Sequence, residues 1–241
     1  MKYGTDNSGK VVILKDKTKE ILFQFSTSKY KQRQSLRQAK DIEEMHLICN
    51  QLLGVHQSKF EVTTLLHLIH EKELKPQVIC ELGTANGGTN LLLASSLPSV
   101  TTVIGIDLYV KNKNRIRFFL DDKKTHFIDG SSYEVCTVMW VKEMLKERKI
   151  DILFIDGDHR YEGVKSDYEL YQPLVSNHGL ICFHDIMPDY LTRHNKYTGM
   201  WAGEVPKYWN ELKQRRSHQE IVENYDQDGQ GIGVIFNAPM E

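Results

Sequence analysis

Two apolar segments of this sequence, residues 151–155 and 180–183, each end abruptly in ionisable residues. Those residues are Asp156, Asp158, His159, His184 and Asp185. Buried strands do not tolerate unpaired charges, so these side chains are expected at the open carboxyl ends of two strands. If the two strands are neighbours, the two groups converge. Carboxylates and imidazoles a few ångströms apart could hold a divalent cation, which would orient a substrate hydroxyl and lower its pKa.

His159 is the natural candidate for a general base at such a site. An imidazole titrates near neutral pH, and this one follows Asp156 closely enough to lie near the mouth of the site. The alternative is a histidine that is bonded to a carboxylate and only anchors its loop.

A glycine-rich loop follows a third apolar segment, in the run VICELGTANGGTN (78–90). Glu81 lies near the end of the predicted strand. Gly83, Gly87 and Gly88 then precede a predicted helix. Glycines at these positions let the backbone turn sharply and approach a ligand without a Cβ in the way. The alternative is a turn that joins strand to helix and binds nothing.

Asp107 ends the next apolar segment about twenty residues after the last glycine, where a carboxylate can accept hydrogen bonds from both ribose hydroxyls of a nucleoside. A pyridine dinucleotide would place its anionic diphosphate against this loop, at short range from Glu81. S-adenosyl-L-methionine instead presents an ammonium and a sulfonium group, which a carboxylate attracts. The spacing ExGxxxGG also departs from GxGxxG. The predicted cofactor is therefore S-adenosyl-L-methionine.

Asp129 and Ser131 come at the end of a further apolar run, on the edge where an adenine would lie. Asp129 or the region of Ser131 could accept a hydrogen bond from the exocyclic amine. The alternative is an Asx turn that caps the following helix, because DGSS is ordinary turn chemistry.

The elements that must position these residues can be predicted from the hydrophobic pattern. Short apolar runs alternate with helix-length segments after Pro76, as expected for βαβ units and a parallel sheet buried on both faces. The runs are 78–82, 103–107, 126–129, 151–156 and 180–185. Helical periodicity is found at 89–97 and 135–148, and within 41–72 it predicts two helices with a break near Gly54.

The two ends of the chain have patterns of their own. Runs 221–225 and 232–236, separated by a polar turn, are typical of an antiparallel closing pair. The runs 11–14 and 21–25 read as a small hairpin, so residues 1–40 are predicted to be an N-terminal appendage to a domain of residues 41–241. The predicted fold class is α/β: a doubly wound, mainly parallel, Rossmann-like sheet with an antiparallel C-terminal hairpin.

Composition narrows the function further. The chain has 241 residues, of which 40% are hydrophobic, enough to bury one sizeable core. A net charge of -1 gives no field that would hold a phosphate backbone, which argues against nucleic-acid binding. The four cysteines contain no CxxC pair, and the sequence has neither a secretory signal nor a run long enough to span a membrane. We expect a cytoplasmic protein without a membrane partner. Both a monomer and a homo-oligomer are compatible with the sequence.

Taken together, the motifs ELGTANGGT, VIGID, IDGDHxYxxVxxD (155–167) and HD (184–185) resemble those of class I methyltransferases. The resemblance is stronger to the O-methyltransferase branch that includes cephalosporin-hydroxylase-like and sugar or macrolide O-methyltransferases. The segment VPKYWNEL (205–212) looks like the aromatic segment that these proteins carry after the fifth strand. The resemblance covers about residues 55–237, and residues 1–40 match no family that we can name.

The resemblance also implies roles for individual residues. In that family the first aspartate after the fourth strand and an acidic pair after the fifth bind magnesium, which corresponds here to Asp156, His184 and Asp185. His184 departs from the family pattern, because it offers nitrogen where magnesium prefers oxygen. Either the preference shifts toward manganese, iron or zinc, or His184 contacts the substrate instead. Relatives also carry a histidine in the loop that contains His159.

The predicted function is transfer of a methyl group from S-adenosyl-L-methionine to a hydroxyl oxygen of a small-molecule substrate of sugar or natural-product type, with a divalent metal (Mg or Mn) as a potential second cofactor. Two alternatives are a nicotinamide-dependent oxidoreductase and a non-catalytic module that binds S-adenosylmethionine. The segment 187–204 contains Arg193, His194, Tyr197 and Trp201. It is either a mobile loop that closes over the substrate or a surface loop whose Trp201 packs on Trp209.

Overall fold

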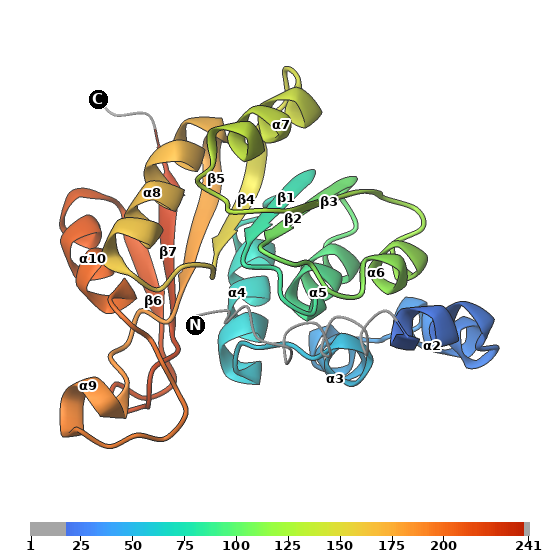
Figure 1. Ribbon diagram of the computed structural model, residues 1–241, viewed down its shortest axis with the longest axis horizontal. Helices are drawn as coiled ribbons and strands as arrows, with labels where there is room; N and C mark the ends of the chain where they lie inside the picture. The colour runs from blue at the N-terminus through green and yellow to red at the C-terminus, as the bar shows by residue number, and fades with distance from the viewer. Residues whose placement is uncertain (1–17, 239–241) are drawn as a thin grey trace.

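The computed structural model describes residues 18–238. Within this part of the chain lies a seven-stranded sheet with the order β3-β2-β1-β4-β5-β7-β6. The strands are β1 Val78–Leu82, β2 Thr102–Asp107, β3 Lys124–Asp129, β4 Ile150–Ile155, β5 Val175–His184, β6 His218–Ile221 and β7 Ile232–Asn237. The first five run parallel, and β7 pairs antiparallel with both β5 and β6. The predicted fold class is confirmed (Figure 1).

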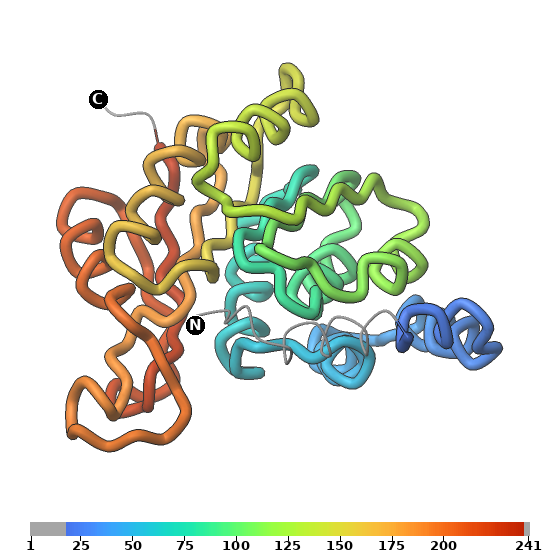
Figure 2. Tube along the Cα trace, viewed as in Figure 1, coloured from blue at the N-terminus to red at the C-terminus, as the bar shows by residue number. Residues whose placement is uncertain are grey.

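Helices cover both faces of this sheet. They are α2 Ser28–Arg37, α3 Ile42–Leu53, α4 Lys59–Glu71, α5 Gly88–Ser96, α6 Lys113–Phe119, α7 Val135–Leu145, α8 Tyr161–Tyr171, α9 Tyr190–His194 and α10 Val205–Leu212, with 3-10 turns at Gln172–Leu174 and Lys213–Arg215. Because neighbouring strand residues point to opposite faces, Ile79 packs into the core below α3, α4, α5 and α6, whereas Cys80 packs below α7, α8 and α10. The chain path is followed most easily in Figure 2.

The two helices predicted between residues 41 and 72 are present, and the break between them falls at Gly54, which has a left-handed backbone with φ +79. The capping box at the start of α4 explains where that helix begins. Ser58 Oγ accepts from the Glu61 backbone N–H, and a Glu61 carboxylate oxygen accepts from the Ser58 backbone N–H. Helix α4 is therefore held at the end that faces the carboxyl edge of the sheet.

The N-terminal prediction was wrong where it can be compared. Residues 21–25, expected as a strand, lie within a helix that spans 18–25. A five-residue apolar run is ambiguous between strand and helix, and here Phe23 packs edge-on against Phe118 of α6 instead of pairing with a strand. The run 11–14 lies outside the described residues. The division at residue 40 stays a prediction.

The closing pair was predicted correctly, but one of its strands is displaced in the sequence. Strand β6 ends at Ile221, so the run 221–225 is mostly loop. The segment that follows folds toward the carboxyl edge of the sheet, where the backbone N–H of Gln230 donates to Asp185 and that of Gly231 donates to Glu61. These long-range contacts outweigh the local strand propensity.

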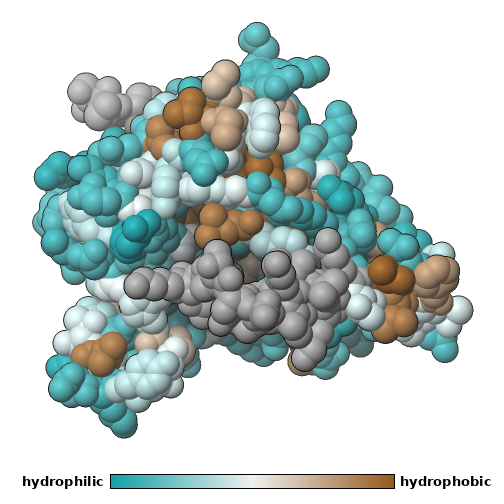
Figure 3. All heavy atoms as spheres, viewed as in Figure 1, coloured by the Kyte–Doolittle hydropathy of each residue, from teal (hydrophilic) through white to brown (hydrophobic). Residues whose placement is uncertain are grey.

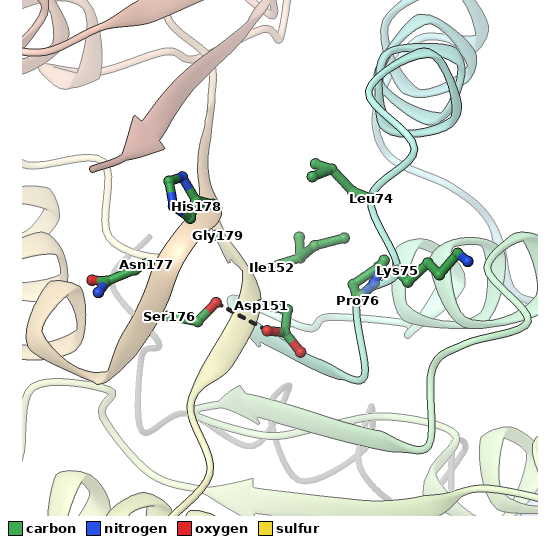
Figure 4. Close-up of a pocket in the computed structure, with 9 residues that line it drawn as sticks. All are labelled: Leu74, Lys75, Pro76, Asp151, Ile152, Ser176, Asn177, His178 and Gly179. Carbon is green, nitrogen blue, oxygen red and sulfur yellow. Dashed lines mark hydrogen bonds between the residues drawn. The ribbon is translucent and has the colours of Figure 1, made fainter. Parts of the chain in front are cut away.

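A pocket opens at the opposite end of the sheet, by the amino ends of β4 and β5 (Figure 4). Its one carboxylate, that of Asp151, accepts from the backbone N–H groups of Gln77 and Val78 and from the Ser176 hydroxyl, at 2.8–3.0 Å. These donors tie three strands together and use three of the acceptor positions of the Asp151 carboxylate. We interpret Asp151 as structural.

The molecular surface carries hydrophobic side chains over α7 and at the N-terminal helices (Figure 3). Among the described residues the exposed ones in these elements include Ile21, Leu22, Phe25, Val135, Met139 and Trp140. Across residues 18–238, every helix is too short or too polar to traverse a bilayer.

Gly88→Ala is expected to destabilise the fold by about 1–3 kcal/mol, because helix α5 starts directly against the break between α3 and α4. A Cβ at position 88 would lie 1.8 Å from the carbonyl oxygen of Gly54. Thermal unfolding should show a Tm lower by several degrees. Gly130→Ala is the matched control, because the nearest atom to its Cβ would be 3.4 Å away. Equal Tm values for the two variants would contradict this prediction.

Candidate active site

The parallel strands β1 to β5 all end at one edge of the sheet, and the register brings their ends together. Leu82 at the end of β1 is paired with Ile106 and Ile155, and Asp107 is paired with Asp129. All of the predicted site residues lie at or just beyond this edge. They are Glu81, Gly83, Gly87, Gly88, Asp107, Asp129, Ser131, Asp156, His159, His184 and Asp185.

Asp156, His184 and Asp185 form a cluster in which one ligand atom from each lies within 4.8 Å of the others. His184 Nδ1 is 3.2 Å from an Asp156 oxygen and 3.5 Å from an Asp185 oxygen. Asp185 has a left-handed backbone with φ 61, a conformation that is uncommon outside glycine and is often found at functional sites. The three residues that the family resemblance singled out are therefore neighbours, with donors of the kind that bind a divalent cation.

The charges in this cluster depend strongly on one another. Burial would lower the pKa of His184, but the carboxylates of Asp156 and Asp185 raise it well above its usual value. Burial would raise the pKa of Asp156, but the neighbouring His184 and His159 hold it below its usual range. The two carboxylates therefore favour a cationic partner between them.

His159 approaches the same two carboxylates from the other side. Its Nε2 lies 3.7 Å from Asp156 Oδ1, and its Nδ1 lies 3.6 Å from Asp185 Oδ2 and 2.9 Å from the carbonyl oxygen of Trp201. The ring stacks on the Trp201 indole with centroids 5.1 Å apart. Burial would lower the pKa of His159, but Asp156 and Asp185 raise it. The imidazole is thus both near the cluster and held in one orientation.

Asp158, the remaining acid of the loop, does not join the cluster. Its carboxylate accepts from the Arg160 guanidinium and from the Tyr133 hydroxyl. Hydrogen bonding from Arg160 lowers the pKa of Asp158 to about 2. This residue fixes the start of α8.

Glu81 is a buried acid with an unused acceptor. Its side chain is 2% exposed, and Oε2 has no hydrogen-bond partner among the described residues. Burial raises the pKa of Glu81 well above its usual value, and the negative charges of Asp156 and Asp107 raise it further. A cationic group nearby would satisfy this oxygen and relieve the repulsion, so the site suits the ammonium and sulfonium of S-adenosylmethionine.

The glycine-rich loop lies directly against the backbone of Asp156, one of the three residues of the cluster. Gly83 has φ +90, and a Cβ there would lie 1.9 Å from the backbone oxygen of Asp156. Gly87 is also left-handed, with φ +83. Glycine is required at position 83 both by its backbone conformation and by this close approach.

Asp107 is hydrogen-bonded to the glycine-rich loop, as expected for a residue that binds the same cofactor. One carboxylate oxygen accepts from the Ala85 backbone N–H at 2.8 Å, and the other accepts from the Tyr109 backbone N–H at 3.0 Å. Each carboxylate oxygen has two acceptor positions, so both retain capacity for a ribose hydroxyl.

Asp129 and Ser131 differ in their availability. The Asp129 carboxylate accepts from the Val110 backbone N–H and from the Lys113 ammonium. Its bonds run to the β2–α6 segment and not to an Asx turn. The Ser131 hydroxyl is buried and makes no hydrogen bond within the described residues, so it is the better candidate for adenine contact.

Two residues before and within α4 reach the cluster and were not predicted. The Gln57 amide donates to an Asp156 oxygen at 2.8 Å. Glu61 is fully buried, and its Oε2 lies 3.5 Å from His184 Nε2. Burial would raise the pKa of Glu61, but the neighbouring His184 and the N–H donors of Gly231 and Gln227 lower it. The pattern Ser-x-x-Glu predicts a capping box, but no local pattern indicates the contact with β5.

The segment between β5 and α10 is held by several specific contacts. The Asp189 carboxylate accepts from the backbone N–H groups of Thr192 and Ala202, and the carbonyl oxygen of His159 accepts from the Glu204 N–H. Trp201 stacks on His159 and not on Trp209, which is buried against Phe183. The segment 187–204 therefore lies beside His159 and borders the active site.

Two solved structures that share this architecture are described as O-methyltransferases. The O-methyltransferase of Bacillus cereus in complex with SAH has 17% sequence identity, a TM-score of 0.57, and coverage of 82% of this chain and 91% of its own. A putative caffeoyl-CoA O-methyltransferase of Staphylococcus aureus has 18% identity, a TM-score of 0.53, and coverage of 92% and 99%. These likenesses define the Rossmann-like methyltransferase fold.

The family itself is shown by the sequence. Residues 51–214 match the family described as Rhamnosyl O-methyltransferase/CmcI, so this chain belongs to that family. An uncharacterised protein of Acanthamoeba polyphaga mimivirus is 34% identical over 112 residues, which is 44% of this chain and 49% of that protein. An uncharacterised protein of Sinorhizobium fredii is 23% identical over 221 residues, which is 85% of this chain and 22% of that protein. The chain thus spans about half the length, or less, of these curated relatives.

Proposed function

We propose that this protein transfers a methyl group from S-adenosyl-L-methionine to a hydroxyl oxygen of a small molecule of sugar or natural-product type. The observation that carries the proposal is the contact between Gly83 and Asp156, because it joins the two halves of the site. Through this contact the glycine-rich loop, which would bind the nucleoside, lies against the cluster of Asp156, His184 and Asp185, which would bind the reacting hydroxyl. Methyl transfer needs both in one place, since the reaction depends mainly on positioning and deprotonation.

The residues that would hold the cofactor follow from their contacts. Asp107 would accept from the ribose hydroxyls, Ser131 would contact the adenine, and the Glu81 carboxylate would face the cationic end. When bound, the cofactor supplies a methyl group on a sulfonium, which needs no acid to leave. A nicotinamide dinucleotide fits less well, because its diphosphate would approach the buried carboxylate of Glu81. Binding of NADH would favour that alternative.

The residues that would act on the substrate lie around Asp156. Asp156, His184 and Asp185 would hold a divalent cation, which when bound would lower the pKa of the acceptor hydroxyl. His159 would accept the hydroxyl proton at an imidazole nitrogen. Asp156 and Asp185 raise the pKa of this ring. A cation bound between the two carboxylates would offset their charge and lower that pKa, so that the neutral ring could accept a proton. A non-catalytic binding module would be favoured if Asp156, His159, His184 and Asp185 were far apart. In the structure these four residues lie close together, which supports catalysis.

The setting of the protein is part of the same proposal. We infer a reducing, cytoplasmic setting, which is supported by the four free cysteines, three of them buried. The partner is a small molecule, and neither a nucleic acid nor a membrane is expected. Formation of a homo-oligomer stays open as a prediction.

Asp107→Ala is expected to weaken binding of S-adenosylmethionine and of its demethylated product, because the ribose hydroxyls lose their shared acceptor. Each charge-assisted hydrogen bond that is lost should cost on the order of 1.5–3 kcal/mol. Titration calorimetry on the purified protein measures this directly. Asp151→Asn, at the opposite end of the sheet, should leave the affinity unchanged. Absence of heat with either ligand on the unaltered protein would refute the proposed cofactor.

A further inference from the structure

Glu61 is placed so that its carboxylate meets a ring of hydrogen-bond donors far from solvent. Oε1 accepts from the backbone N–H of Gly231 at 2.6 Å and from the Gln227 amide at 3.2 Å. Oε2 accepts from the Ser58 backbone N–H at 3.1 Å and faces His184. Glu61 therefore links the start of α4 to the loop after β6 and to the end of β5.

His184 presents its two nitrogens to different groups. Nδ1 faces Asp156 and Asp185, the other two residues of the cluster. Nε2 lies 3.5 Å from Glu61 Oε2 and has no hydrogen-bond partner within the described residues. A histidine that ligates a metal through one nitrogen usually donates its other N–H to a carboxylate or carbonyl, which fixes both the tautomer and the ring orientation.

We propose that Glu61 is a positioning residue that accepts the Nε2 proton of His184 and thereby directs the Nδ1 lone pair toward a divalent cation held with Asp156 and Asp185. This inference rests on the metal site in the proposed function. It explains why a buried carboxylate stands behind the one nitrogen ligand of the cluster. It also assigns His184 to the metal and not to the substrate.

The loop after β6 adds a second connection. The backbone N–H of Gln230 donates to Asp185 Oδ1 at 2.9 Å, and the next N–H, that of Gly231, donates to Glu61. Two consecutive N–H groups thus bind the proposed metal ligand Asp185 and Glu61, the carboxylate that faces the proposed ligand His184. Both residues have left-handed backbones, with φ 59 and 85, so this segment is shaped for the contact.

Glu61→Gln tests the inference with a nearly isosteric change. The amide offers one acceptor oxygen where the carboxylate offered two, so His184 Nε2 competes with Ser58 and Gly231 for it. Calorimetry with Mn²⁺ on the full chain should show affinity reduced by about 10–100-fold, whereas affinity for S-adenosylmethionine is retained. Ser58→Ala is the matched control, because it weakens the same capping box and leaves the carboxylate in place. It should bind Mn²⁺ as the unaltered protein does.

The tautomer can be measured without a variant at position 61. With Zn²⁺ bound, long-range ¹H–¹⁵N spectra should show His184 protonated at Nε2, and the spectrum of His184→Asn identifies its signals. Protonation at Nδ1 would overturn the inference even if Glu61→Gln failed to fold. Equal Mn²⁺ affinity of folded Glu61→Gln and the unaltered protein would also overturn it. If the unaltered protein binds no Mn²⁺, the metal site and this inference fall together, whereas methyl transfer is tested separately by cofactor calorimetry.

Discussion

Replacing His159 by Gln is expected to reduce turnover by roughly 10²–10⁴-fold and to leave the affinity for S-adenosylmethionine unchanged. Glutamine keeps a similar size and some hydrogen bonding, but it cannot accept a proton. An alcohol is almost wholly protonated at neutral pH, so transfer to its oxygen needs a base. The defect should shrink at high pH, where the substrate hydroxyl ionises more readily without help. Initial rates of product formation across a pH series measure both effects.

His67→Gln provides a matched control, because that imidazole is exposed on α4 and, within residues 18–238, its ion-pair partner is Glu43. It should have normal turnover. If His159→Gln instead loses cofactor binding and melts several degrees lower, His159 anchors its loop through Trp201 and is not the base. Full turnover in His159→Gln would mean that the proton leaves to another group.

Removing divalent cations with a strong chelator is expected to abolish activity, and adding Mn²⁺ back should restore it. The reason is that Asp156 and Asp185 lie together with His184 in a geometry suited to ligation. His184→Asp replaces the nitrogen donor with a hard oxygen, so the preference should shift from Mn²⁺ toward Mg²⁺. Activity assays of both proteins over a concentration series of each ion give the two preferences.

A second reading of the cluster makes the opposite prediction. If Asp156, His184 and Asp185 contact the substrate directly, activity should be indifferent to the chelator. The cofactor affinity measured with and without chelator is the control, because Asp107 and Ser131 are the residues proposed to bind the nucleoside. Cofactor binding that vanished with the metal would point to a structural ion instead.

The parts of this protein that follow local rules could be predicted from the sequence. Strands buried on both faces have continuous apolar runs, so β1 and β4 were located within a residue or two. Because parallel strands end at one edge, Asp156 and Asp185 were expected to converge if their two strands were neighbours, and β4 and β5 are neighbours in the sheet. A buried strand excludes unpaired charges, so the ionisable residues that directly follow β4 and β5 indicated the open carboxyl edge of the sheet.

The features that depend on distant contacts could not be predicted. Glu61 has the sequence signature of a helix cap, and only the packing of α4 on the sheet brings it to His184. The helix at residues 18–25 has the apolar run of a strand, and its conformation depends on aromatic packing against α6. In both cases the deciding partner lies more than thirty residues away in the sequence.

The pairing of Glu61 with His184 has an evolutionary consequence. A carboxylate at position 184, as in the family pattern, would face the buried carboxylate of Glu61, and two like charges at that distance are costly away from water. We therefore expect the two positions to change together among relatives. Chains with an acid at the position of His184 should have a neutral or basic residue at the position of Glu61, and an acid should return there only where the ligand is a histidine. In this lineage the exchange of one metal donor would have become coupled to a residue from a different helix, so His184→Asp alone is expected to shift the metal preference at a cost in stability.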